Sequence, residues 1–149
     1  MSEPKPPKKG EACRLPEPNS SAAVDAILAL KTFAVVGLSP RPERPSHYVS
    51  EYVMEAGYTV IPVNPGHKEI LGLKCWPSVS DIPGPVDCVV VFRRPEEALE
   101  PVMQAIAKKA KAVWLQDGVY TEVGERMARD AGLLVVSNDC LMRRLSRRR

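Results

Sequence analysis

The feature that most constrains the fold of this chain is an alternation between short apolar runs and amphipathic segments. The apolar runs are residues 33–36, 59–63, 87–92, 112–115 and 133–136. Several are apolar at consecutive positions, which is typical of strands covered by helices on both faces. Strands that alternate with helical segments form βαβ units on a parallel sheet. The sequence therefore predicts a single α/β domain, Rossmann-like and doubly wound, with a five-stranded, mainly parallel sheet and helices on both faces.

Helical periodicity accounts for the segments between the runs. Asn19 or Ser20 is a suitable cap for a short helix before the first run. After the first run, apolar side chains recur at intervals of three and four residues until Gly57, which is a typical helix stop. Residues 66–86 are less regular and predict a short extended piece followed by one helical turn.

Two further helices are predicted in the second half of the chain. The first follows Pro95, has two glutamates in its first turn and turns an apolar face inward; that face consists of Leu99, Val102, Met103, Ile106 and Ala110. The second runs from Thr121 to Ala131, and the spacing predicts that Val123, Met127 and Ala131 point inward.

Composition divides the 149 residues into three parts. Residues 1–18 are rich in proline and charge and predict a flexible extension. Residues 19–142 predict the folded domain and carry 12 basic against 15 acidic side chains, which argues against a specific nucleic-acid partner. Residues 143–149 include five arginines and predict a solvated tail.

Cysteine usage and hydropathy indicate the compartment. Cys13, Cys75, Cys88 and Cys140 form no C-x-x-C pair, so neither a zinc site nor a disulfide framework is predicted. No secretory signal and no run of ~18 apolar residues is present, so we expect a cytoplasmic protein with no membrane span. Cys88 and both tryptophans are expected in packing roles, and Cys140 is either a packed residue or a thiol able to exchange with another sulfhydryl.

In an open doubly wound sheet, ligands bind beyond the carboxyl ends of the strands. The loop after the first run reads Gly37-Leu38-Ser39-Pro40-Arg41-Pro42-Glu43-Arg44-Pro45-Ser46-His47. Helix-start amides, the two serine hydroxyls and the two guanidinium groups predict an anion site. His47 is either a neutral hydrogen-bonding group near the ligand or a structural residue, and His67 is expected on the surface.

The same loop differs from a dinucleotide-binding turn. Ser39 and Pro42 occupy the second and third glycine positions of G-x-G-x-x-G. After the second run, Val63-Asn64-Pro65 places a neutral amide where an NAD domain has an acidic residue that binds the ribose. Both features favour a nucleotide with a phosphorylated ribose over NAD.

Two later loops complete the predicted site. Arg93-Arg94-Pro95 follows the third run and suggests either a second phosphate clamp or surface pairing with Glu96 or Glu97. Gln116-Asp117-Gly118 follows the fourth run. Because Asp117 would repel a phosphate, we expect that loop to contact an uncharged part of the ligand.

With these loops in view, the chain resembles the small CoA-binding proteins, whose Rossmann-like domain is also the amino-terminal domain of the succinyl-CoA synthetase α subunit. The resemblance covers about residues 20–142. It rests on "AVVGLSPRPERPSHYVSEYVMEAGYTVIPVNPG", "EILGLKCWPSVSDIPGPVDCVVVFRRPEE" and "AVWLQDGV", in this order. Asp117 and Asn138-Asp139-Cys140 depart from the family pattern, which more often has an apolar residue and Asp-Arg-Cys at these places.

The resemblance implies a coenzyme A or acyl-CoA site in which the first loop surrounds the phosphates and Asn64 and Pro65 lie on the adenosine side. The expected site residues are Gly37, Leu38, Ser39, Pro40, Arg41, Arg44, Ser46, His47, Val63, Asn64, Pro65, Phe92, Arg93, Arg94, Pro95, Gln116 and Gly118.

The resemblance also implies binding without ligase catalysis, because the synthetase uses a histidine on a separate domain. The residues themselves show no catalytic triad, no paired carboxylates and no metal-ligand spacing, so no catalytic or metal-binding residue is predicted. Two alternatives remain open. One is an NAD(P)-dependent oxidoreductase, and the other is a nucleotide-sensing regulatory module whose arginine tail contacts an acidic partner.

Overall fold

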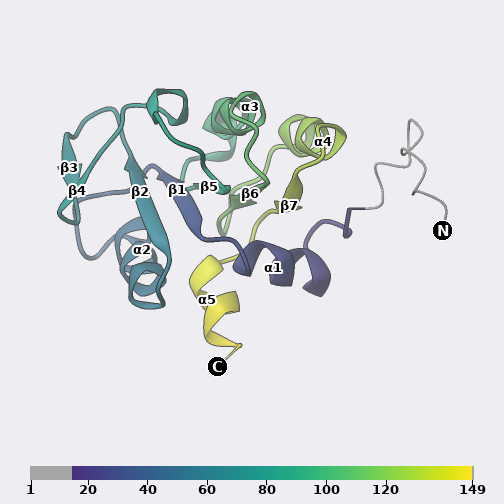
Figure 1. The fold of residues 1–149 in the computed structure, drawn as a ribbon, viewed down its shortest axis with the longest axis horizontal. Helices are drawn as coiled ribbons and strands as arrows, with labels where there is room; N and C mark the ends of the chain where they lie inside the picture. Colours follow the sequence, from purple (N-terminus) through teal and green to yellow (C-terminus); the bar gives the residue numbers. More distant parts are fainter. Residues whose placement is uncertain (1–14, 149) are drawn as a thin grey trace.

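A computed structural model describes residues 15–148 and shows a five-stranded parallel sheet between two layers of helices (Figure 1). The strands are β1 (Thr32–Val36), β2 (Thr59–Val63), β5 (Cys88–Val91), β6 (Ala112–Leu115) and β7 (Leu134–Val136). Their order is β2-β1-β5-β6-β7, and every neighbouring pair is parallel. The predicted fold class and all five predicted strands are confirmed.

The helices divide between the two faces of the sheet (Figure 1). One face is covered by α1 (Ser21–Leu28), α2 (Pro45–Glu55) and α5 (Leu141–Ser146), and the other by α3 (Leu99–Ala107) and α4 (Glu122–Asp130). Alternate strand residues feed the two cores, so that Cys88 and Val90 of β5 face one layer and Val89 and Val91 face the other. This two-sided burial explains the consecutive apolar residues of the strands.

Local signals set the ends of the first two helices as predicted. The Oγ of Ser20 accepts a hydrogen bond from the amide of Ala23 at 3.1 Å and caps α1. Pro45 is the first residue of α2, where its missing amide hydrogen costs nothing. Gly57 follows the end of α2 with a φ of +101°, a conformation that glycine adopts without strain.

The helix expected directly behind Pro95 is instead interrupted. Pro95–Glu97 form a separate 3-10 turn, η3, and α3 starts afresh at Leu99. Pro101 supplies the reason, since a helix running on from Pro95 would place it in an interior turn, where it lacks an amide and its ring clashes with the carbonyl four residues earlier. The restart puts Pro101 in the first turn of α3. Met103, predicted inward, is exposed, while Val102 and Ala105 are buried.

The inward face predicted for α4 is wrong. Val123, Met127 and Ala131 are exposed, and the buried positions are Gly124 and Ala128. A Cβ on Gly124 would lie 3.2 Å from Cδ1 of Leu99 in α3. The two helices therefore approach so closely that only small residues fit between them, and this contact outweighs the hydrophobicity of the larger side chains.

A small hairpin lies beside β2 and forms a separate two-stranded sheet. Its strands are β3 (Glu69–Ile70) and β4 (Leu73–Lys74), followed by the short 3-10 turn η2 (Val79–Asp81). Trp76 forms a β-bridge with Val63, and its half-buried ring lies 4.1 Å from the Nζ of Lys74. Trp114, by contrast, is fully buried, as predicted.

The two ends of the chain were expected to lie outside the folded domain. Most of the proline-rich extension expected over residues 1–18 lies outside the described residues. At the other end, residues 143–146 belong to α5, where Arg143 and Arg144 make ion pairs, and Arg148 pairs with Asp25 at 3.1 Å. The solvated tail expected from Arg143 onward is wrong at these residues. Within residues 15–148, every helix is too short or too polar to cross a bilayer.

Candidate functional site

The strand order places a switch point between β1 and β5. The crossover that leaves β1 contains α2 on one face, whereas the one that leaves β5 contains α3 on the other. Loops that diverge in this way leave a crevice at the carboxyl ends of the strands. A cleft of about 1020 Å³ lies there, between the loops that follow β1, β5 and β6, the start of α2, and α5.

Eleven of the seventeen predicted site residues line this main cleft. They come from three separate loops and from the first turn of α2, as the topology requires. These residues are Gly37, Ser39, Arg41, Arg44, Ser46, Phe92, Arg93, Arg94, Pro95, Gln116 and Gly118.

The other six predicted residues do not line the main cleft. Leu38 is fully buried in the core, and Pro40 is exposed outside the cleft. His47 is buried behind the loop. The Asn64 side chain closes a turn, because its Oδ1 accepts from Gly66 N at 3.0 Å and its Nδ2 donates to Leu38 O at 3.0 Å.

Val63 and Pro65 instead line a second cleft of about 950 Å³, between η2 and α3. Arg93 lines both clefts and so stands where they meet. The residues predicted for the adenosine side are thus separated from those predicted for the phosphates, and one guanidinium lies between the two groups.

The loop after β1 is braced by its own polar groups. The amide of Ser39 donates to the Oγ of Ser46 at 2.9 Å, and the Oγ of Ser39 accepts from the amide of Arg41 at 3.1 Å. The Nδ1 of His47 lies 2.8 Å from the carbonyl oxygen of Ser39. Both serine oxygens therefore accept hydrogen bonds within the loop, and each hydroxyl keeps its hydrogen to donate.

A close backbone approach explains why the loop begins with glycine. Gly37 has a φ of +84°, and a Cβ placed there would lie 2.3 Å from the carbonyl oxygen of Phe92. The β1 and β5 loops are therefore in direct contact. Any side chain at position 37 would separate them.

The arginines of the cleft differ in how far their charge is compensated. Arg94 pairs with Glu97 at 2.8 Å and with Glu96 at 3.6 Å, which fits the surface-pairing reading of that loop. Arg41 lies 3.5 Å from Glu43, and both side chains are well exposed. Within residues 15–148, neither Arg44 nor Arg93 has a carboxylate within ion-pair distance. These two guanidinium groups are the ones most available to a ligand anion.

Gln116 is a structural residue and a cleft residue at once. Its Oε1 accepts a hydrogen bond from the amide of Leu141 at 2.9 Å and so holds the start of α5. The side chain is only 4% exposed, yet within the described residues its Nε2 donates to no protein group, and the residue lines the cleft. The sequence predicted the polar contact of Gln116 with a ligand but not its role in α5.

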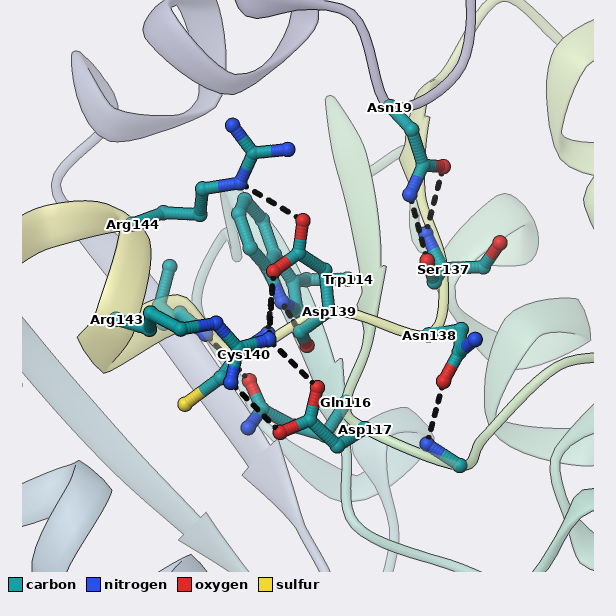
Figure 2. A network of polar contacts seen from close by, with 12 residues as sticks. Asn19, Trp114, Gln116, Asp117, Ser137, Asn138, Asp139, Cys140, Arg143 and Arg144 are labelled. Carbon is teal, nitrogen blue, oxygen red and sulfur yellow. Dashed lines mark hydrogen bonds and ion pairs between the residues drawn. The ribbon is translucent and has the colours of Figure 1, made fainter.

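The adjacent Asp117 is paired rather than free. Arg143 of α5 donates to both of its carboxylate oxygens, at 3.0 and 2.8 Å (Figure 2). Nη2 of Arg143, which donates the 2.8 Å bond to Asp117, also donates to Oδ1 of Asp139 at 3.0 Å. Asp139 accepts a further hydrogen bond from Nε of Arg144 at 2.8 Å. The hydrogen bonds that Arg143 donates to Asp117, and then the one it donates to Asp139, raise the pKa of its guanidinium.

Asp139 is the buried centre of this network. Its partial burial acts to raise its pKa, but the hydrogen bond from Arg144, then those from the Cys140 amide and Arg143, outweigh burial and lower the pKa below the ordinary value. Its backbone carbonyl accepts from Nε1 of Trp114 at 3.0 Å.

Asn138, with a φ of +52°, accepts from the amide of Gly118 at 2.8 Å (Figure 2). The loops after β6 and β7 are thereby joined.

Several cleft residues were missed by the sequence analysis. Tyr48 and Val49 continue α2 beyond the predicted loop, and Val119 follows the predicted Gly118. Met142, Arg143 and Ser146 belong to α5, which had been taken for the end of the domain and a tail. The apolar spacing of Leu141 and Leu145, both buried, was the signal for this helix. Cys140 lines the cleft but is only 7% exposed.

Metal-binding clusters are not found among residues 15–148, where no group of three or more histidine, cysteine, aspartate or glutamate side chains is suitably placed. The main cleft instead presents guanidinium groups, hydroxyls and one side-chain amide together with apolar side chains. This set of groups suits a ligand that combines anionic groups with an uncharged chain.

Comparison with known proteins identifies the family of this chain. A family model described as "CoA binding domain" matches residues 31–146. The uncharacterized protein YneT of Bacillus subtilis is 38% identical over 124 residues, which cover 83% of this chain and 92% of that protein. The ADP-forming acetate–CoA ligase II of Archaeoglobus fulgidus is 33% identical over 101 residues; these cover 66% of this chain but only 15% of the ligase.

Solved structures agree with the sequence relatives. A hypothetical protein from Pyrococcus horikoshii has a TM-score of 0.81 and 46% identity, with coverage of 83% of this chain and 88% of that one. A dinucleotide-forming acetyl-coenzyme A synthetase from Candidatus Korarchaeum cryptofilum has a TM-score of 0.64 and 28% identity, covering 71% of this chain and 25% of the synthetase. The match to the family model extends over most of the folded residues and includes all three loops of the main cleft. The chain therefore belongs to the CoA-binding domain family, to which the corresponding part of the ADP-forming acetate–CoA ligases is homologous.

Proposed function

We propose that this chain binds coenzyme A or an acyl-CoA in the main cleft, with the phosphates near Arg44 and Arg93. The observation that carries the proposal is the meeting of three post-strand loops around two guanidinium groups that have no carboxylate partner within residues 15–148. Guanidinium groups bind phosphate oxygens through charge-assisted, often bidentate hydrogen bonds. Membership of the CoA-binding family supports this ligand class.

The braced loop after β1 supports high-affinity binding. Because Ser39, Ser46 and His47 already hold one another, little conformational freedom is lost when a phosphate arrives. Pro45 and the first turn of α2 line the cleft beside them, so the helix dipole adds to the favourable field for an anion.

The apolar and uncharged groups of the cleft suit the pantetheine arm. Val119 and Met142 contribute apolar surface to the cleft, and the unpaired Nε2 of Gln116 provides a donor for an amide carbonyl of the arm. Arg93 connects the main cleft with the second cleft, where Val63 and Pro65 offer an apolar wall to the adenine ring.

Titration calorimetry tests the proposal directly. CoA and acetyl-CoA should bind at sub-millimolar concentration, and NADH should not compete. Arg44→Ala and Arg93→Ala should each weaken CoA binding by about ten- to a hundredfold, since a charge-assisted hydrogen bond contributes about 1.5–3 kcal/mol. Arg126→Ala, which removes an exposed arginine on α4 that pairs with Glu122, is the matched control and should leave the affinity unchanged. Absence of CoA binding to the unmodified chain would refute the proposal.

We further propose that binding occurs without turnover by this domain alone. The family relatives named as ligases are several times longer than the part this chain matches. After incubation with acetyl-CoA, ADP and phosphate, mass spectrometry should recover acetyl-CoA unchanged. Release of free CoA at a rate proportional to protein concentration would contradict this part of the proposal.

A further inference from the structure

The pairing of Asp117 with Arg143 carries an inference about which ligands the cleft accepts. Both side chains line the main cleft, and they come from different elements, the loop after β6 and α5. Among the described residues that line this cleft, Asp117 is the single acidic one. Its carboxylate is 56% exposed, so an unpaired charge there would act directly on a bound anion.

Arg143 is held in a defined orientation. It donates to both oxygens of Asp117, a bidentate arrangement that fixes the plane of the guanidinium. Asp139, only 8% exposed, accepts from Nη2 of Arg143 and holds the guanidinium on the side away from Asp117 (Figure 2). The Nε of Arg143 and one hydrogen on Nη1 are not used in these bonds.

Asp139 does not depend on Arg143 for compensation. Arg144 donates to its Oδ2 at 2.8 Å, and the amide of Cys140 donates to its Oδ1 at 2.8 Å. Removal of the Arg143 side chain would therefore leave Asp117, rather than Asp139, as the uncompensated carboxylate. The effect of such a change on ligand binding can thus be traced to one group.

We propose that Arg143 is a specificity-determining residue of the cleft: by neutralising Asp117 it makes the β6 side of the cleft compatible with a polyanionic ligand of the CoA type. The inference rests on the proposed function, and it corrects the expectation that the β6 loop repels phosphate. It also assigns α5 to the ligand site, where Met142, Arg143 and Ser146 form one wall.

A double-mutant cycle tests this assignment by calorimetry with CoA. Arg143→Ala should weaken CoA by on the order of tenfold at low salt, because several ligand charges then face an unpaired carboxylate across a solvated cleft. Asp117→Asn alone should strengthen CoA binding about threefold or leave it unchanged. The double variant, Asp117→Asn with Arg143→Ala, should return to within about threefold of the unmodified chain.

The rescue separates an electrostatic role from a structural one. If Arg143 served only to anchor α5, the double variant would bind as weakly as Arg143→Ala, and that result would overturn the inference. The loss in Arg143→Ala should also shrink in 0.5 M salt, since exposed charges are screened over ~4 Å at that ionic strength. A loss that is the same at both salt concentrations would likewise overturn it.

Two controls complete the design. Glu122 and Arg126 form an ion pair on α4, 3.6 Å apart and outside the cleft. The substitutions Glu122→Gln and Arg126→Ala, singly and together, should leave the CoA affinity unchanged. Circular dichroism melting shows whether Arg143→Ala folds; if it does not, Arg143→Gln replaces it, because glutamine keeps a donor toward Asp139 without the charge. Absence of CoA binding by the unmodified chain would refute the proposed function, whereas binding without rescue would refute only this inference.

Discussion

The Nδ1 of His47 lies 2.8 Å from the carbonyl oxygen of Ser39, eight residues earlier in the chain. A carbonyl can only accept, so the imidazole carries its hydrogen on Nδ1 in this contact. His47 is 8% exposed and its Nε2 faces Glu51 at 3.5 Å. His47 thus connects the first turn of α2 to the loop after β1, and this contact restricts the conformation of the loop.

Replacement of His47 by alanine should therefore weaken CoA without removing any group that lines the cleft. We expect a loss of about three- to tenfold, because the Ser39 carbonyl loses its donor and the loop must be ordered on binding. His47→Asn places an amide donor near the position of Nδ1 and should recover most of the affinity. Calorimetry on the two variants, compared with Arg126→Ala, measures this; equal losses in both His47 variants would contradict the prediction.

Arg41 and Arg44 can be assigned to phosphates by comparing CoA with dephospho-CoA. If the pair holds the ribose phosphate, the double substitution Arg41→Ala with Arg44→Ala should weaken CoA much more than dephospho-CoA. Arg44 should dominate, because Arg41 lies 3.5 Å from Glu43 while Arg44 has no ion-pair partner within residues 15–148. Dissociation constants for both ligands decide the matter, and equal weakening of the two would assign the arginines to the diphosphate.

Gly37→Ala should destabilise the fold more than any other glycine substitution near the cleft. The new Cβ would lie 2.3 Å from the carbonyl oxygen of Phe92, and the φ of +84° is unfavourable for alanine. We expect a decrease of about 3 kcal/mol or more in the free energy of unfolding, measured by urea titration. Gly118→Ala is the matched control: its φ is +78°, but a Cβ there meets no atom within 4 Å, so only the conformational cost of about 1–2 kcal/mol applies.

Acid should destabilise the protein through two carboxylates. The pKa of Asp87 is lowered, because hydrogen bonds from the amides of Lys31 and Thr32, and then Lys111, outweigh the opposing effect of burial; the pKa of Asp139 is lowered as described above. A group whose pKa is lower in the folded state than in the unfolded state stabilises the fold above the ordinary aspartate value of about 3.9. That contribution is lost as the pH falls from there through the lowered folded pKa.

Urea titrations between pH 7 and pH 2.5 measure this effect. The free energy of unfolding contributed by these two groups should be steady down to about pH 5 and should fall below about pH 4. Asp139→Asn should be less stable at pH 7 and should show a shallower decline in acid. A decline as steep as that of the unmodified chain would mean that Asp139 does not contribute to acid sensitivity. Asp81→Asn, an exposed carboxylate, is the control.

The amino-acid sequence by itself determined the parts of this protein that depend on local periodicity and composition. Consecutive apolar residues in 88–91 and 112–115 require a strand buried on both faces, and Pro45 and Gly57 set the start and stop of α2. The alternation of strands and helices implied the parallel sheet, and hence the edge at which a ligand would bind. Eleven predicted residues from four segments meet there for this reason.

Tertiary contacts decided the rest, because they join residues far apart in the chain. Gly124 and Ala128 face inward on α4 only because α3 lies against them, which no periodicity within α4 reveals. The charge of Asp117 is neutralised by Arg143, an arginine 26 residues away. Arg143, which had been taken for the start of a tail, lines one wall of the cleft with Met142 and Ser146. Sequence patterns report which face of a segment is apolar; which partner covers that face, and which charge meets which, is determined when the whole chain packs.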